Sequence, residues 1–203
     1  MLSFPAFARD LSTIRKALLF ALLLFVAGGV IGWIGTGSLQ KLLSGQLESL
    51  SKISGSLKES AHPQWSFFQF IFLNNSIKGV LIIFLGAIFG ILPALFLLIN
   101  GGVIGYLIHI SAMQGMDLFD LIVKGLLPHG IIEIPAIIIA CAFGLQFGWN
   151  VISDLFSSAA AREKRSGAWP AFMRQTLRAS IWIVVLLFVA AIIESTITFS
   201  LLS

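Results

Sequence analysis

Two ionisable residues stand four positions apart in an otherwise apolar segment of the chain. The segment Pro128-His129-Gly130-Ile131-Ile132-Glu133-Ile134-Pro135 places His129 and Glu133 on one face if it is helical. An imidazole and a carboxylate so placed can hydrogen-bond to each other or bind one metal ion together. Three interpretations follow: a buried polar clamp between helices, a relay for protons or cations, and two ligands of a metal site.

The metal interpretation needs a third ligand, because zinc sites normally use at least three protein groups. The candidates are Glu194, His109 and His62, and the spacing selects none of them. Glu194 stands among Val, Leu, Ile and Ala, where an unpaired carboxylate has to be protonated or face the bundle interior. We therefore hypothesise that Glu194 and the His129/Glu133 pair face a common polar interior. His129, Glu133 and Glu194 are then the candidate metal ligands, with zinc as the candidate cofactor.

Two asparagines extend this set to a predicted intramembrane polar site of Asn75, Asn100, His129, Glu133 and Glu194. Asn100 precedes Gly101-Gly102, which predicts a helix cap and a tight hairpin between two packed spans. The alternative is a discontinuous helix whose free backbone groups line a polar site. No residue is assigned a catalytic role.

The elements that position these residues are predicted from hydropathy. Of the 203 residues, 58% are hydrophobic and 11% charged, and the mean hydropathy is +0.99, which excludes most soluble classes of protein. The chain is expected to be one all-α domain, a polytopic transmembrane helix bundle of about five spans. These are residues 17–34, 77–98, 102–116, 130–148 and 180–202.

The third of these runs is short for a helix that needs about 20 residues to cross the hydrocarbon layer. A broken or re-entrant helix near residues 100–128 is therefore the alternative. Five crossings put two clusters of Lys and Arg on one side, which the positive-inside rule makes the cytoplasm. Those clusters are Arg9, Arg15 and Lys16, and Arg162, Lys164, Arg165, Arg174 and Arg178.

Two segments lie outside the expected spans. Leucines recur at helical spacing within residues 36–64, which predicts an amphipathic helix on the outer membrane surface. Residues 150–177 form a basic cytoplasmic segment that suits anionic lipid or a cytoplasmic partner. The N-terminus is then cytoplasmic and the C-terminus external, in the plasma membrane. Small residues four apart, such as Gly86 and Gly90, let helix backbones approach closely and suggest a homodimer.

The pattern resembles a known family at several points along the chain. Those points are Phe72-Leu73-Asn74-Asn75, Gly86, Gly90, Leu98-Ile99-Asn100-Gly101, Gly105, Leu127-Pro128-His129-Gly130 and Glu133-Ile134-Pro135-Ala136. Together they resemble the stage II sporulation protein M family. The resemblance implies a protein of about five spans, whose sporulation member anchors a peptidoglycan-degrading complex while its partners carry the chemistry.

Three functions remain open. The first is a non-enzymatic scaffold or assembly component of a membrane complex, with the lipid bilayer and other membrane or cell-envelope proteins as partners. The second is a transporter or channel component that uses the intramembrane His and Glu. The third is an intramembrane metal-dependent hydrolase. The net charge of +4 lies mostly between apolar runs, so it indicates membrane orientation and no nucleic-acid partner.

Overall fold

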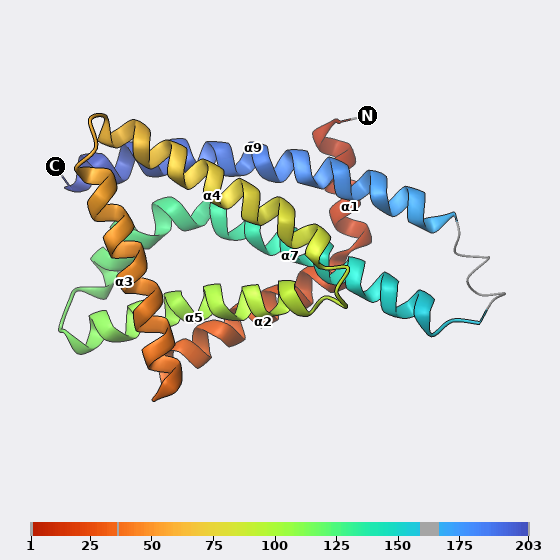
Figure 1. Ribbon diagram of the computed structural model, residues 1–203, viewed down its shortest axis with the longest axis horizontal. Coiled ribbons are helices and arrows are strands. Elements are labelled where there is room, and N and C mark those ends of the chain that lie inside the picture. The colour runs from red at the N-terminus through yellow and green to blue at the C-terminus, as the bar shows by residue number, and fades with distance from the viewer. Residues whose placement is uncertain (1, 36, 159–166, 203) are drawn as a thin grey trace.

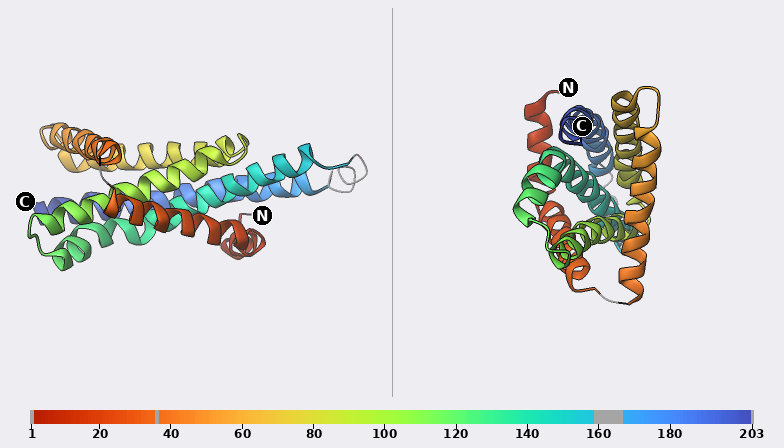
Figure 2. Two further views of the ribbon diagram at one scale, coloured as in Figure 1. Left: turned by 90° about the horizontal axis from the view of Figure 1, so that it is seen from below. Right: turned by 90° about the vertical axis from the view of Figure 1, so that its left-hand side faces the viewer.

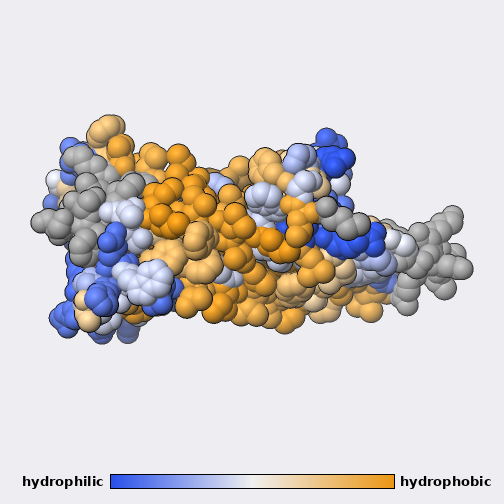
Figure 3. Space-filling model, turned by 90° about the horizontal axis from the view of Figure 1, so that it is seen from above, coloured by the Kyte–Doolittle hydropathy of each residue, from blue (hydrophilic) through white to orange (hydrophobic). Residues whose placement is uncertain are grey.

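The structure is a bundle of long apolar helices. This computed structural model describes residues 2–35, 37–158 and 167–202; the side chains of residues 38, 124–125, 128–129 and 197–202 lie outside the description. Five of its helices are long and apolar enough to cross a membrane. They are α2 (Arg15–Ile34), α4 (Pro63–Leu85), α5 (Ile91–Met113), α7 (Leu127–Leu155) and α9 (Ala168–Leu202). The predicted all-α bundle is confirmed, and Figure 3 shows its apolar belt between more hydrophilic ends.

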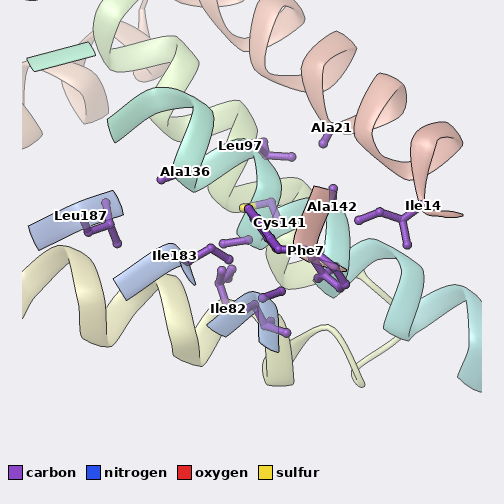
Figure 4. Close-up of a cluster of buried hydrophobic side chains, with 14 of the residues drawn as sticks. Phe7, Ile14, Ala21, Ile82, Leu97, Ala136, Cys141, Ala142, Ile183 and Leu187 are labelled. Carbon is purple, nitrogen blue, oxygen red and sulfur yellow. The ribbon is translucent and has the colours of Figure 1, made fainter. Parts of the chain in front are cut away.

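Helix α7 is the centre of the bundle. It contacts all four other spans, while α2 packs along α5 and α4 packs along α9 (Figure 1). Residues 140–144 of α7 are fully enclosed, because spans on several sides cover this stretch. Its alanines and Cys141 meet Leu97 of α5 and Ile183 of α9 in one apolar cluster (Figure 4). Small side chains on α7 thus allow four helices to surround it.

The two ends of the bundle differ. One end holds the N-terminal helix α1 (Phe4–Thr13), the end of α7 and the start of α9 (Figures 1 and 2). The other end holds α3 (Ser38–Lys58) and the end of α9. Arg178 of α9 is paired with the buried Asp10 of α1 at 2.6 Å, which ties the two basic parts of the chain together. Arg162, Lys164 and Arg165 lie outside the described residues. The cytoplasmic assignment of this end remains a prediction.

The second and third spans begin and end elsewhere than expected. Residues 77–98 are not one span, because α4 ends at Leu85 and a turn at residues 86–90 reverses the chain into α5. Gly90 has a φ of +74° and Phe89 a φ of +52°, and the left-handed region suits glycine. A Cβ on Gly148 of α7 would lie 2.2 Å from the Gly90 nitrogen, so the turn is pressed against that helix. The turn is as apolar as the spans, which is why hydropathy does not reveal it.

Asn100-Gly101-Gly102, the predicted hairpin, lies inside α5 instead. The Asn100 amide donates to the Phe96 carbonyl at 2.7 Å within the same helix. A Cβ on Gly101 would lie 2.1 Å from the Phe25 carbonyl oxygen, and one on Gly105 would lie 2.0 Å from that of Gly29. These glycines therefore allow α5 to contact the backbone of α2. They are used for packing within the chain, and the homodimer stays a prediction.

The structure also shows where the other predicted segments begin and end. Within the range expected to be broken, α5 runs unbroken to Met113, and the irregularity follows it. Asp117 caps a short helix α6 (Leu118–Asp120), which continues as a π-helix η1 (Leu121–Leu126) into α7. The outer segment forms α3, which crosses the end of the bundle (Figure 2). Much of the basic segment 150–177 is helical, in the last turn of α7 and the first turns of α9.

The contact between α2 and α5 predicts the effect of a single methyl group. Gly101→Ala should lower the free energy of unfolding by about 1–3 kcal/mol, because the added Cβ clashes with the backbone of α2. Gly55→Ala on α3 is the matched control, since a Cβ there meets nothing within 4 Å. Unfolding in mixed micelles of denaturing detergent, followed by circular dichroism, measures both. Equal stability of the two variants would contradict the close approach.

Candidate functional site

Two carboxyl groups meet between α7 and α9. The side chains of Glu133 and Glu194 are hydrogen-bonded to each other, and both residues are half-buried within membrane-crossing helices. An ionised carboxylate only accepts hydrogen bonds, so such a bond requires a proton on one of the two groups. Two carboxyl groups so placed can therefore share one proton between two helices. The hypothesis that Glu194 and the His129/Glu133 pair face a common polar interior stays a prediction, because the side chain of His129 lies outside the described residues.

Asn75 of α4 is the third member of this cluster. Its side-chain amide lies close enough to Glu133 to interact with the carboxyl group. The Oδ1 of Asn75 also accepts a hydrogen bond from Nδ2 of Asn74 at 3.2 Å. Three helices that are distant in sequence thus each contribute one polar group. We call Asn75, Glu133 and Glu194 the carboxyl cluster.

Lys78 adds a positive charge that was not among the predicted site residues. It follows Asn75 by one turn of α4, and its ammonium interacts electrostatically with Glu133. Ser76 between them is buried, and its hydroxyl has no hydrogen-bond partner among the described residues. The predicted span began at residue 77, so Lys78 stood at its expected boundary. With α4 at Pro63–Leu85, a lysine well inside a span is the signal that would have identified it.

The backbone around Glu133 is irregular on both sides. The π-helix η1 ends seven residues before it, and Pro135 lies inside α7 two residues after it. A proline within a helix leaves the carbonyl one turn earlier without its usual donor, here that of Ile131. Single π-helical turns occur frequently at functional sites. Glu133 therefore lies where α7 is least regular.

Three other candidate residues do not join the carboxyl cluster. Asn100 bonds within α5, as described above. His109 of α5 packs edge-on against Trp33 of α2, with ring centroids 5.4 Å apart. His62 precedes α4 and is exposed. The side chain of His129 lies outside the described residues, so its relation to Glu133 is a prediction.

The metal hypothesis has no further support from the geometry. Among the described residues, no group of three His, Cys, Asp or Glu side chains is arranged to hold a metal ion. Glu133 and Glu194 supply two oxygen ligands, and neither His109 nor His62 joins them. A zinc site at this position would thus depend on His129. It remains a hypothesis.

Comparison with known proteins gives a family and no established activity. The family model described as "Stage II sporulation protein M" matches residues 21–199. One uncharacterized protein of Methanocaldococcus jannaschii is 28% identical over 182 residues, which cover 89% of this chain and 93% of the relative. Another from that organism is 31% identical over 117 residues, covering 58% of this chain and 50% of that relative. No solved structure matches the chain.

The hydrogen bond between the two carboxyl groups predicts energetic coupling. A double-mutant cycle of Glu133→Ala and Glu194→Ala should give an interaction energy of about 0.5–3 kcal/mol, because the residues contact each other. The unfolding free energies are measured in mixed micelles. A cycle of Glu133→Ala with Asn100→Ala is the control and should be additive within about 0.5 kcal/mol. If both cycles are additive, the two carboxyl groups do not interact.

Proposed function

Because the chain belongs to the stage II sporulation protein M family and has five membrane-crossing helices, we propose that it is a membrane transport component that carries a proton. The proton-binding group is the pair Glu133 and Glu194. The observation that supports this function is the hydrogen bond between two carboxyl groups in membrane-crossing helices. Ionisable residues at such positions commonly mark ion pathways and proton relays.

A purely structural clamp between helices would not need two carboxyl groups. Two helices can be joined by neutral amides, which carry no charge and avoid the desolvation penalty of a carboxylate. Two carboxyl groups sharing a proton can also release it, which an amide pair cannot do. The presence of Glu on both α7 and α9 therefore favours proton binding over a purely structural link between the two helices.

The surrounding charges suit a site that gains and loses a proton. With one proton shared, the pair carries one negative charge, and Lys78 supplies one positive charge nearby. Neutrality lowers the free energy of keeping these groups inside a membrane-crossing bundle. Removing the proton leaves one unbalanced negative charge, which is unfavourable in apolar surroundings. Deprotonation would thus favour a rearrangement that hydrates the pair, as transport requires.

Proton flux in liposomes tests this function. We expect protein in liposomes with an internal pH-sensitive dye to conduct protons in response to a potassium diffusion potential. Glu133→Gln and Glu194→Gln should reduce the rate to that of protein-free liposomes, because an amide cannot exchange the proton. Glu59→Gln is the matched control, since Glu59 is exposed at the end of α3, outside the spans.

Two results would contradict proton transport. One is wild-type flux no faster than that of protein-free liposomes. The other is unchanged flux in both glutamine variants when the proteins are equally well folded and reconstituted. In the second case the carboxyl cluster would be the clamp considered from the sequence, and the conduction would arise elsewhere.

An assembly role is the second candidate, and α3 is the observation that favours it. This helix lies across one end of the bundle, with Leu43 buried and most of its polar residues exposed. Glu48 and Lys52 form an exposed ion pair on it at 2.7 Å. A polar helix outside the spans offers a surface to another envelope protein. Photo-crosslinkers at Glu48 and Lys52 in native membranes should then yield one defined partner, whereas scattered products would oppose this role.

A further inference from the structure

A second polar region lies at the opposite end of α7. A partly open cavity of about 470 Å³ is lined by three parts of the chain: the junction of α1 and α2, the last turns of α7 and the first turns of α9. The fully buried residues 140–144 of α7 separate it from Glu133. The cavity is therefore distinct from the carboxyl cluster. Its lining includes Gln146, Asn150, Gln175, Asp154, Trp149 and Trp169.

The polar groups of the cavity are mostly neutral. Nε2 of Gln146 donates to Oδ1 of Asn150 at 2.9 Å. This bond uses the donor of one amide and the acceptor of the other, which leaves Oε1 of Gln146 as an acceptor beside Nδ2 of Asn150 as a donor. Gln175 adds another amide from α9. Adjacent neutral donors and acceptors match hydroxyl groups, each of which both donates and accepts.

Among the residues that the structure describes, the lining of the cavity carries one charged side chain, that of Asp154. Neither Lys nor Arg is among the described residues that line it, whereas Asp154 is. Its carboxylate accepts from Nε1 of Trp169, across the cavity wall formed by α7 and α9. The nearby Arg178 is paired with Asp10 and does not line the cavity.

The position of the cavity and its tryptophans indicate that a ligand would reach it at the membrane–water boundary. The lining residues of α7 belong to the last ten of its membrane-crossing stretch, Gly130–Leu155, so the cavity is near one membrane surface. Trp149 is exposed at this level, where tryptophan commonly lies at the membrane–water boundary. Its indole offers a flat apolar surface beside the amides. An aromatic face next to neutral hydrogen-bonding groups suits a sugar ring, which has an apolar face and hydroxyl edges.

We propose that this cavity binds a neutral polyhydroxylated group, the chemistry shared by a free sugar and the headgroup of a glycolipid. The amides of Gln146, Asn150 and Gln175 bond the hydroxyl groups, and Trp149 covers the apolar face of the ring. This site does not depend on the proposed proton transport, because it uses none of the residues of the carboxyl cluster.

Binding to a defined glycolipid tests the site. Protein in phosphatidylcholine nanodiscs is titrated with a photoactivatable glucosyl diacylglycerol, irradiated, and the labelled peptides are identified by mass spectrometry. We expect saturable labelling within residues 146–154 and 168–175. Asn150→Leu should weaken binding by about tenfold or more, because it removes the amide at similar volume in a site built for hydrogen bonds. Gln175→Leu, on the other wall, should act in the same direction.

Controls separate the site from general effects. Gln64→Leu and Gln114→Leu replace exposed glutamines outside the cavity and should bind like the wild type. Melting temperatures establish that each variant is folded, and two variants on different helices keep the test valid if one fails to fold. Competition by free glucose identifies a sugar as the ligand, whereas saturable labelling without such competition identifies a glycolipid headgroup.

Three results would overturn the proposal. They are labelling that does not saturate or lies outside the two ranges, undiminished binding in both Asn150→Leu and Gln175→Leu, and displacement of the probe by phosphatidylglycerol. The last would mean that the cavity selects an anionic headgroup. None of these results bears on proton flux, so failure here and failure of the proposed function can be told apart.

Discussion

Polar side chains inside a membrane-crossing bundle must find partners within the protein, because lipid offers none. The carboxyl cluster meets this constraint by drawing one group from each of α4, α7 and α9. Asn75 alone on α4, or Glu194 alone on α9, would be unfavourable in hydrocarbon. Their contact with Glu133 therefore stabilises one particular alignment of the three helices. The same contact creates a group of residues able to bind a proton.

Close backbone contacts make that alignment possible. Gly86, which directly follows α4, lies against Gly144 of α7, where a Cβ on Gly86 would come within 2.1 Å of the Gly144 carbonyl oxygen. This contact sets how far α4 slides along α7, and so brings Asn75 to the level of Glu133. Glycines between α2 and α5 hold the other half of the bundle together. Close packing and polar pairing thus support each other, since the first sets the distances that the second requires.

The two polar regions occupy opposite ends of α7, and the apolar centre of the same helix keeps them apart. Residues 140–144 are fully covered by neighbouring spans, and Cys141 lies in the middle of this stretch. The carboxyl cluster contains ionisable groups, whereas the cavity near Asn150 contains mainly amides and indoles. One region is thus suited to exchanging a proton and the other to bonding a neutral ligand. A helix of mostly apolar and small residues can carry both because its polar residues are confined to its two ends.

The sequence by itself determined the class of fold, the number of membrane-crossing helices and the family resemblance, because these depend on composition and on hydropathy averaged along the chain. It also singled out Glu133, Glu194 and Asn75, since an isolated polar residue in an apolar run needs a partner. Only the tertiary structure decided that the chain turns at residues 86–90 and that Lys78 lies beside the cluster. An apolar turn leaves hydropathy unchanged and is defined by the helix it packs against. Partners on different helices depend on how those helices slide and rotate, which no local pattern encodes.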